Sequence, residues 1–293
     1  MQIGVIGSGN MGRGIAQVSA TAGHTVVLQD IDEGQLSAAL DDIASTMAGG
    51  VERGKLTAVE RDAALDRIQG TTDLEEAVES ADLVIEAVPE NLDLKQQVFE
   101  DLDAAAPEDA VLASNTSSLS LTEVASVLER PERAVGLHFF NPPHIMDLVE
   151  IIVAEQTDAE TESTATAFVE DLDKEAVVVR DTAGFASSRL GIALGLEAIR
   201  MVEEGVASAS DIDAAMRTGY GHPMGPLELT DHVGLDVRLD IAEYLREELG
   251  ERFRPPQLLR RKVRAGNYGK KSGEGFYVWE DRELVGEADT GGR

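Results

Sequence analysis

The side chains best suited to move a proton are His138 and Glu150, which lie twelve positions apart in two apolar segments. Residues 134–139 and 148–153 have the composition of strands, and a spacing of twelve suits facing positions on adjacent strands better than one helix face. A histidine held through its second ring nitrogen by a carboxylate is the usual general base near neutral pH. Taken alone, a His–Glu pair is more often structural than catalytic, so a catalytic role needs support from the rest of the chain.

A glycine-rich turn follows the first apolar segment, residues 2–6, and opens a helical stretch. An acidic residue ends the next apolar segment, 18 positions after the last glycine. In this βαβ context the spacing is that of a dinucleotide-binding fingerprint, in which the helix N-terminus faces a pyrophosphate. The acid would accept hydrogen bonds from the ribose and repel a 2′-phosphate, so we expect NAD rather than NADP. The residues expected to bind it are Gly7, Gly9, Asn10, Met11, Gly12 and Asp30.

Polar loops follow several later apolar segments, at residues 86–91, 114–118 and 138–143. Ligands of an open parallel sheet bind beyond the carboxyl ends of its strands, so we expect these loops and the glycine turn to share one site. Turn chemistry and helix capping explain Ser118 and Ser120 but leave Asn115 and Ser117 without a structural purpose.

The alternation of apolar segments and helical periodicity predicts an α/β fold: a Rossmann-type doubly wound sheet over residues 1–182 with an inserted helical hairpin at about 33–68. An all-helical C-terminal domain is expected over 183–280, apart from a short strand-like segment at 275–279, and an acidic tail over 281–293. Ser210 is predicted to cap one of the helices.

Composition narrows the function. The chain of 293 residues has 25 Lys plus Arg against 55 Asp plus Glu, a formal net charge of −30, and no cysteine. That charge disfavours nucleic acid and anionic membranes as partners, and we hypothesise a salt-rich cytosol in which it is screened. The beginning of the chain does not resemble a signal peptide and no apolar run could span a membrane, so a cytoplasmic protein is expected. No metal site is expected.

Several motifs occur together in one order, and through them the chain resembles the L-3-hydroxyacyl-CoA dehydrogenases, including the 3-hydroxybutyryl-CoA dehydrogenases. The resemblance covers all but about the last dozen residues. The motifs are Gly-x-Gly-x-x-Gly with Asp30, Ser114-Asn115-Thr116-Ser117-Ser118, Leu137-His138-Phe139-Phe140-Asn141-Pro142, Leu148-Val149-Glu150, Asp181-Thr182-Ala183-Gly184-Phe185, Pro223-Met224-Gly225-Pro226 and Gly269-Lys270-Lys271-Ser272-Gly273-Glu274-Gly275-Phe276-Tyr277.

The resemblance implies NAD-dependent oxidation of an L-3-hydroxyacyl-CoA to the 3-oxoacyl-CoA, with a short acyl chain such as 3-hydroxybutyryl. It implies His138 as the general base, Glu150 as the residue that orients it, and Ser117 and Asn141 as contacts of both substrate and nicotinamide. A homodimer through the helical domain is also implied. Further cofactor contacts are implied at Ala87, Glu90, Lys95, Asn115 and Lys271.

The resemblance implies that the helical hairpin contacts the nucleotide end of coenzyme A. This favours Arg53 and Lys55, at the tip of the hairpin, as substrate contacts. A solvent-exposed turn that happens to contain two basic residues is equally compatible with the sequence. Ser188 stands where the family usually has asparagine. Its side chain is shorter and donates only one hydrogen bond, so a water-mediated substrate contact, or none, is expected in place of a direct one.

Three alternatives stay open. A dehydrogenase of free hydroxy acids, of the gulonate dehydrogenase type, shares the first domain and a His–Glu pair. A non-catalytic, crystallin-like homologue would bind nucleotide only, and the pair of His138 and Glu150 argues against it. A nucleic-acid role for the glycine turn is disfavoured by the charge.

Overall fold

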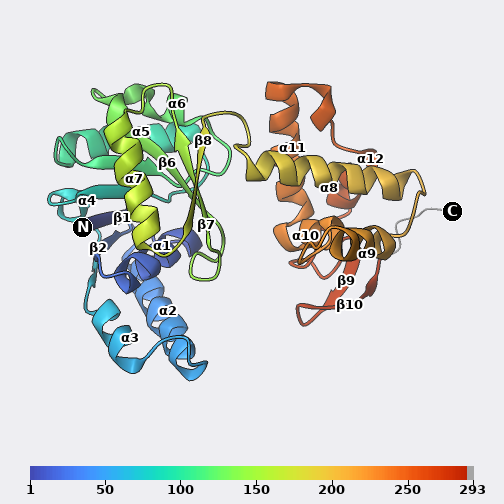
Figure 1. The fold of residues 1–293 in the computed structure, drawn as a ribbon, viewed down its shortest axis with the longest axis horizontal. Coiled ribbons are helices and arrows are strands. Elements are labelled where there is room, and N and C mark those ends of the chain that lie inside the picture. The colour runs from blue at the N-terminus through green and yellow to red at the C-terminus, as the bar shows by residue number, and fades with distance from the viewer. Residues whose placement is uncertain (289–293) are drawn as a thin grey trace. The chain divides into compact units, whose positions relative to one another are not determined.

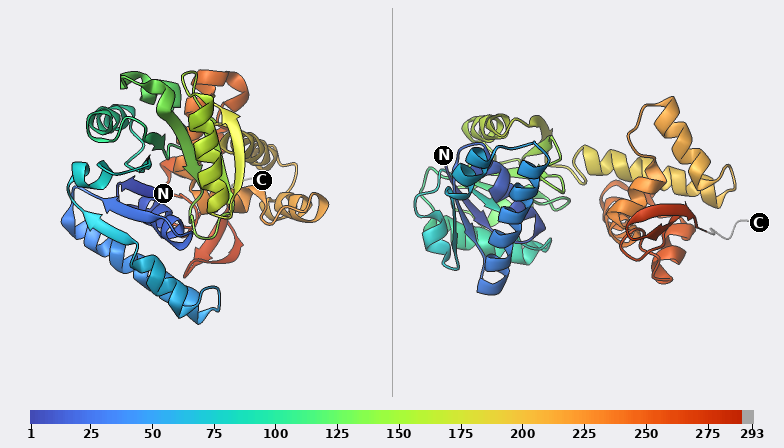
Figure 2. Two further views of the ribbon diagram at one scale, coloured as in Figure 1. Left: turned by 60° about the vertical axis from the view of Figure 1, so that its left-hand side comes forward. Right: turned by 90° about the horizontal axis from the view of Figure 1, so that it is seen from below.

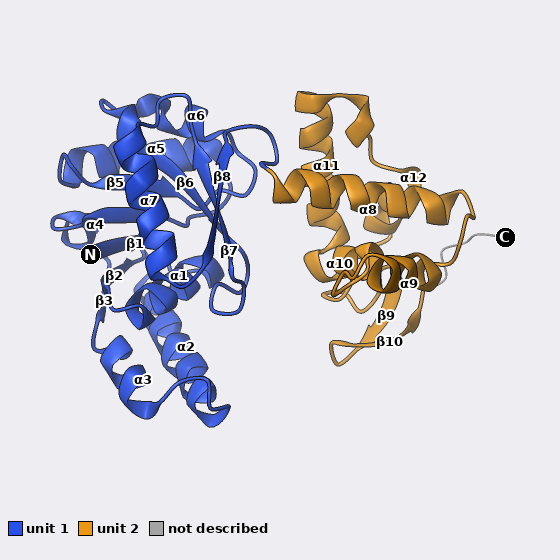
Figure 3. Ribbon diagram, viewed as in Figure 1, with its two compact units in different colours: residues 1–185 blue, residues 186–293 orange. Residues whose placement is uncertain are grey.

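The computed structural model describes residues 1–288, and the chain divides into two compact units, residues 1–185 and the part that begins at Ala186 (Figures 1 and 3). The first unit contains β1 (Gln2–Ile6), α1 (Asn10–Thr21), β2 (Thr25–Gln29), α2 (Glu33–Glu52), α3 (Ala58–Leu65), β3 (Ile68–Thr71), α4 (Leu74–Val78), β4 (Leu83–Glu86), α5 (Leu92–Ala105), β5 (Val111–Ser114), α6 (Leu121–Val124), β6 (Ala134–Phe139), β7 (Leu148–Val153), α7 (Ala159–Asp171) and β8 (Glu175–Arg180).

One eight-stranded sheet organises this unit, in the order β3-β2-β1-β4-β5-β6-β7-β8. Neighbouring strands are parallel except for β6 and β7, which are antiparallel. Strands β1, β4 and β5 are buried almost throughout, as the apolar runs predict for strands covered on both faces. The predicted doubly wound α/β sheet is confirmed.

Two apolar cores lie on the two faces of the sheet. Side chains of α1, α2, α3 and α7 form one core with residues of the sheet, among them Ile3 and Val5 of β1. Side chains of α4, α5 and α6 pack on Ile6 and on alternate residues of β4 and β5. Because successive residues of a strand point to opposite faces, one apolar strand serves both cores.

The helical hairpin is formed by α2 and α3 and extends away from the sheet (Figure 2). Asp32 caps α2 by accepting a hydrogen bond from the Gln35 N–H. Thr57 and Glu60 form a reciprocal capping box at the start of α3, which leaves residues 53–57 as the hairpin tip. Strand β3 follows directly and was not predicted, because its sequence Ile-Gln-Gly-Thr has little apolar content.

The second unit contains α8 (Ser187–Glu203), α9 (Ala209–Gly219), α10 (Pro226–Val233), α11 (Leu235–Leu249) and α12 (Gln257–Arg264), followed by β9 (Tyr277–Glu280) and β10 (Glu283–Glu287). The prediction of a helical domain with one short strand-like segment near its end is confirmed, and that segment, β9, pairs with β10 as an antiparallel hairpin. Residues 283–287 are therefore a strand rather than part of a tail, and residues 289–293 of that expected tail lie outside the described residues. Ser208, not Ser210, caps α9.

Two buried carboxylates join the hairpin to the helices of this unit. Asp231 accepts hydrogen bonds from the N–H groups of Phe276 and Tyr277 and from the Trp279 indole. Asp213 accepts from the Tyr277 hydroxyl and from two N–H groups at the start of α10. Within residues 1–288 no helix has both the length and the apolar composition to cross a membrane.

Candidate active site

His138 and Glu150 occupy directly paired positions on β6 and β7. The Nδ1 atom of His138 lies 2.9 Å from Oε2 of Glu150, and the two residues are 6% and 1% exposed. Because an ionised carboxylate can only accept hydrogen bonds, Nδ1 is the nitrogen that carries the proton, and in a neutral imidazole Nε2 then has the lone pair. The rings of Phe140 and Phe185 flank the imidazole at centroid distances of 4.5 and 5.8 Å. The predicted pairing across adjacent strands is confirmed.

The glycine turn brings the backbone of β1 against the first turn of α1. Gly7 has φ +95°, a conformation that favours glycine, and a Cβ at Gly12 would lie 1.7 Å from the Gly7 carbonyl oxygen. A Cβ at Gly9 would meet nothing within 4 Å, and no side chain caps the start of α1. Within the described residues, the N-terminus of α1 therefore has no side-chain cap and has room beside Gly9, as an anion site requires.

Asp30 lies just beyond β2 and is fixed by its neighbours. Its Oδ2 accepts hydrogen bonds from the Ser8 N–H at 2.8 Å and from the Ser8 hydroxyl at 2.7 Å, while Oδ1 accepts from the Asp32 N–H at 3.0 Å. Partial burial acts to raise the pKa of Asp30, but these hydrogen bonds lower it below its usual value. A fixed, ionised carboxylate beside the glycine turn fits a dinucleotide ribose. Sequence reasoning missed Ser8, although a hydroxyl residue within the motif was the available signal.

Glu90 fixes the polar loop that follows β5. Its Oε1 accepts hydrogen bonds from the Thr116 hydroxyl, the Ser117 N–H and the Ser118 N–H at 2.7, 2.8 and 3.0 Å. Burial acts to raise the pKa of Glu90, but the Lys95 ammonium and these donors together lower it. Ser117, a predicted substrate contact, thus lies on a loop whose backbone is held by a carboxylate.

A buried ion pair lies below this loop, at the carboxyl end of β4. The Lys95 ammonium is 2.7 Å from Oε1 of Glu86, and the two side chains are 1% and 0% exposed. Glu86 also accepts hydrogen bonds from the Val88 N–H and the Ser114 hydroxyl, each at 2.7 Å. Glu86 was missed by sequence reasoning, although an acid ending the run Leu-Val-Ile was a signal. The structure gives Lys95 protein acceptors in the interior, so its predicted cofactor contact stays a prediction.

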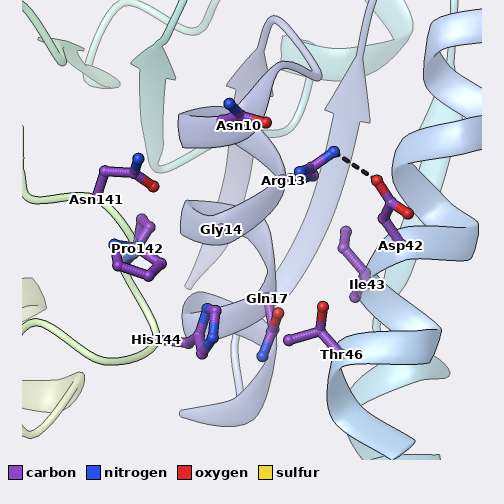
Figure 4. Close-up of a pocket in the computed structure, with 11 residues that line it drawn as sticks. Asn10, Arg13, Gly14, Gln17, Asp42, Ile43, Thr46, Asn141, Pro142 and His144 are labelled. Carbon is purple, nitrogen blue, oxygen red and sulfur yellow. Dashed lines mark hydrogen bonds and ion pairs between the residues drawn. The ribbon is translucent and has the colours of Figure 1, made fainter. Parts of the chain in front are cut away.

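Asn115 and Asn141 have different surroundings. Asn115 is buried, and its Oδ1 accepts a hydrogen bond from the Phe139 N–H at 3.0 Å. Asn141 is exposed, precedes the cis-proline Pro142, and lines a cavity of about 210 Å³ together with Asn10 (Figure 4). The dinucleotide turn and the predicted substrate contact Asn141 therefore border the same space. Ala87 lies beside the turn, since its carbonyl oxygen is 3.0 Å from a Cβ built at Gly7.

Basic side chains gather beside this space. Arg53 and Lys55 of the hairpin tip line a cavity of about 510 Å³ together with His144 and Lys174. Burial lowers the pKa of His144, and the positive charges of Arg53, Lys174 and Lys55 lower it further. Asp147, Asp171 and Asp173 line the same cavity, close in sequence to Lys174, so its charge is mixed. The positive charges of Arg53 and Lys55 at the hairpin tip are the ones available to an anionic ligand.

Two predicted site residues belong to the second unit. Ser188 lies in the first turn of α8. Lys271 pairs with Asp236 at 2.6 Å and its ammonium lies 5.5 Å from the centre of the Tyr268 ring. Their predicted contacts with substrate and cofactor stay predictions.

The doubly wound sheet, the glycine turn with its ionised aspartate and the paired imidazole together define a Rossmann-type dehydrogenase. Comparisons with known proteins agree. Residues 2–182 match the model of the "3-hydroxyacyl-CoA dehydrogenase, NAD binding domain" and residues 184–279 match its C-terminal domain. The chain therefore belongs to the 3-hydroxyacyl-CoA dehydrogenase family, whose members are NAD-dependent oxidoreductases.

Individual relatives extend over nearly the whole chain. A 3-hydroxybutyryl-CoA dehydrogenase of Mycobacterium tuberculosis is 44% identical over 95% of this chain and 98% of its own length. The human mitochondrial hydroxyacyl-coenzyme A dehydrogenase is 42% identical over 94% of this chain and 90% of its own. The crystal structure of (S)-3-hydroxybutyryl-CoA dehydrogenase PaaH1 from Ralstonia eutropha matches with a TM-score of 0.92 and 38% identity, covering 96% of this chain and 99% of that one.

Proposed function

We propose that the protein oxidises a short-chain L-3-hydroxyacyl-CoA, such as 3-hydroxybutyryl-CoA, to the 3-oxoacyl-CoA, reversibly and with NAD. The observation that carries this proposal is the 2.9 Å contact between His138 and Glu150 at the carboxyl-terminal edge of a dinucleotide-binding sheet. The names of the relatives from M. tuberculosis and R. eutropha support the short acyl chain.

The proton chemistry rests on His138. Its Nε2 accepts the proton of the substrate 3-hydroxyl, and Glu150 stabilises the imidazolium that forms, because the carboxylate is buried and close. Bound NAD supplies the acceptor for the hydride of carbon 3. In the reverse direction the imidazolium returns the proton to the ketone oxygen. Ser117 and Asn141 hold the substrate oxygen and the nicotinamide side.

The cavities beside Asn141 and beside Arg53 and Lys55 support an acyl-CoA substrate, because they adjoin each other. The cavity beside Asn141 and the cavity beside Arg53 and Lys55 share Gln17, Thr46 and His144 as lining residues. A thioester at Asn141 can therefore extend along α1 and α2 toward the hairpin tip, where phosphates would meet positive charge. A free hydroxy acid would leave the basic cavity unused.

Three further features belong to this proposal. A homodimer through the second unit is supported by apolar side chains exposed on its helices, Leu190 at 70%, Leu229 at 38% and Val233 at 41%. A salt-rich cytoplasm is supported by the net charge of −30. Ser188 contacts the substrate less directly than the usual asparagine, through its single hydroxyl.

The decisive experiment compares acetoacetyl-CoA with free hydroxy and keto acids as substrates, with NADH and NADPH, in concentrated KCl. Oxidation of NADH with acetoacetyl-CoA but not with free acids is expected. Faster turnover of the free acids would replace the proposal by the gulonate dehydrogenase type, and NADH binding without turnover of any of them would indicate a non-catalytic homologue. A series of acyl lengths would then define the chain length.

A further inference from the structure

Lys174 lies immediately before β8, yet its side chain reaches the loop that joins β6 to β7. Its ammonium donates hydrogen bonds to the carbonyl oxygens of Pro143 and Met146, each at 2.7 Å. These two carbonyls are on either side of a turn in which the N–H groups of Ile145 and Met146 both donate to the Pro142 carbonyl oxygen. The ammonium therefore closes this turn from outside.

The same loop is held at two other points. Pro143 is buried against α1, where a Cβ built at Gly14 would lie 2.6 Å from the proline Cδ. At the far end, the Glu175 N–H donates to the Asp147 carbonyl oxygen at 2.8 Å. Among residues 1–288, no side chain other than Lys174 is seen to hydrogen-bond to the backbone of residues 142–147. The side of the loop away from α1 thus depends on one lysine.

The hydrogen bonds of Lys174 matter because the loop that they hold contains Asn141. Asn141 is the second residue of the loop formed by residues 140–147, three residues after His138, and lines the cavity beside Asn10 (Figure 4). Its amide must be placed relative to the imidazole, and displacements of about 1 Å at such a position can cost about 100-fold in rate. Asn141 is exposed and directly precedes the turn that Lys174 holds, so the position of residues 142–147 contributes to where its amide lies.

We infer that Lys174 is a positioning residue of the active site, which holds the loop of residues 140–147 and through it places Asn141 for hydride transfer. The inference rests on the proposed function. It assigns Lys174 a different task from Arg53 and Lys55, which line the same basic cavity.

The rival role is a direct contact with the phosphates of coenzyme A. The geometry disfavours that role, because two carbonyl oxygens at 2.7 Å already occupy two of the three ammonium hydrogens. Burial lowers the pKa of Lys174, while Asp147 and Asp173 raise it, so local acids already neutralise its charge in part. Arg53 and Lys55 have no comparable hydrogen bonds to backbone carbonyl groups of this loop among the described residues.

The test compares two substrates, acetoacetyl-CoA and acetoacetyl-pantetheine, which lacks the phosphates. Lys174→Met is expected to lower kcat about 10- to 100-fold with both substrates equally, with little change in KM. Lys55→Met is expected to raise KM for acetoacetyl-CoA alone. If Lys174→Met instead raises KM for acetoacetyl-CoA and behaves as wild type with the pantetheine thioester, Lys174 is a phosphate contact and the inference is overturned.

Two further variants separate positioning from folding. Lys174→Arg keeps donors for both carbonyls and is expected to recover most of the kcat, whereas Lys174→Gln, with one NH₂ group, should recover little. NADH affinity and the unfolding midpoint are measured for each variant, with Arg61→Met, at a half-buried position of α3, as a matched loss of one charge. If Lys174→Met does not fold, the kcat values of Lys174→Arg and Lys174→Gln are compared instead, provided that their unfolding midpoints are equal. A higher kcat for Lys174→Arg supports the inference, and equal kcat values overturn it. Absence of wild-type turnover of acetoacetyl-CoA would refute the proposed function instead.

Discussion

Asn115 and Phe139 are joined across the ends of two neighbouring parallel strands, where the Phe139 N–H donates to Oδ1 of Asn115 at 3.0 Å. Phe139 directly follows His138, so this bond fixes the backbone that carries the imidazole. Asn115→Ala should leave a buried N–H without an acceptor and lower the free energy of unfolding by about 1–3 kcal/mol. Chemical denaturation measures this loss. Asn115→Asp retains an acceptor oxygen and should lose less, and an Ala variant as stable as wild type would contradict the assignment.

Replacing the proposed general base should remove catalysis without removing the fold. His138→Gln should lower kcat about 10²- to 10⁴-fold, because the 3-hydroxyl proton then has no positioned acceptor. NADH affinity, measured by fluorescence, should change little. Glu150→Gln should cost less and shift the pH–rate profile of oxidation, because the protonated imidazole loses its carboxylate partner. Full turnover by His138→Gln would remove the basis of the proposed mechanism.

Glu90 should make the loop of Ser117 sensitive to acid. Hydrogen bonds and the Lys95 charge hold the pKa of Glu90 below its usual value despite burial. The ionised side chain therefore stabilises the fold above the unfolded-state pKa of about 4.3, and this contribution is lost as pH falls through the lower folded-state pKa. Urea unfolding across this range should show the loss in wild type and a smaller pH dependence in Glu90→Gln. An identical pH dependence in both proteins would count against the role of Glu90.

Asp30 should determine the choice of cofactor. Its ionised carboxylate repels a 2′-phosphate, so Asp30→Ser should raise the ratio of kcat/KM with NADPH to that with NADH. The change should come from weaker use of NADH as well as better use of NADPH, because the ribose loses its acceptor. Asp32→Asn, which keeps an oxygen to cap α2, is a matched control two residues away. If Asp30→Ser leaves the ratio of kcat/KM for NADPH to that for NADH unchanged, other residues determine the preference for NAD.

The net charge of −30 should make stability depend on salt. Raising KCl from about 0.1 M to about 1 M shortens the screening length from about 10 Å to about 3 Å and reduces repulsion between the acidic side chains. The thermal unfolding midpoint should rise with KCl, and activity lost on dilution should return when salt is restored. Equal concentrations of an uncharged osmolyte serve as the control. A midpoint independent of KCl would refute the salt-rich cytoplasm.

The sequence was sufficient for the main architecture and for the His–Glu pair, because both depend on patterns local to one or two strands. Buried runs such as Leu-Val-Ile at 83–85 predict central parallel strands, and the spacing of His138 and Glu150 matches their register in the sheet. Strand β3 was not predictable in this way, since its residues at the sheet edge are largely exposed and only its pairing with β2 makes it a strand.

Residues that act by supporting others were harder to predict. Nothing in the spacing of Glu86 and Lys95 distinguishes a buried pair from two solvated charges, because burial depends on how α5 packs on β4. The two bonds of Lys174 likewise join segments 31 and 28 positions apart, and a lysine before a strand has no sequence signature for such contacts. Ser208 rather than Ser210 caps α9, and two serines two positions apart offer the same sequence signal for a cap.

The antiparallel pairing of β6 and β7 places both members of the proposed proton-transferring pair, His138 and Glu150, on neighbouring strands. The proposed ribose-binding acid, Asp30, follows β2, which β1, β4 and β5 separate from β6 in the sheet. Cofactor preference and acid–base chemistry are thus encoded in separate stretches of the gene. If those roles hold, a change of coenzyme, by selection or by design, can proceed beside β2 without retuning the imidazole on β6.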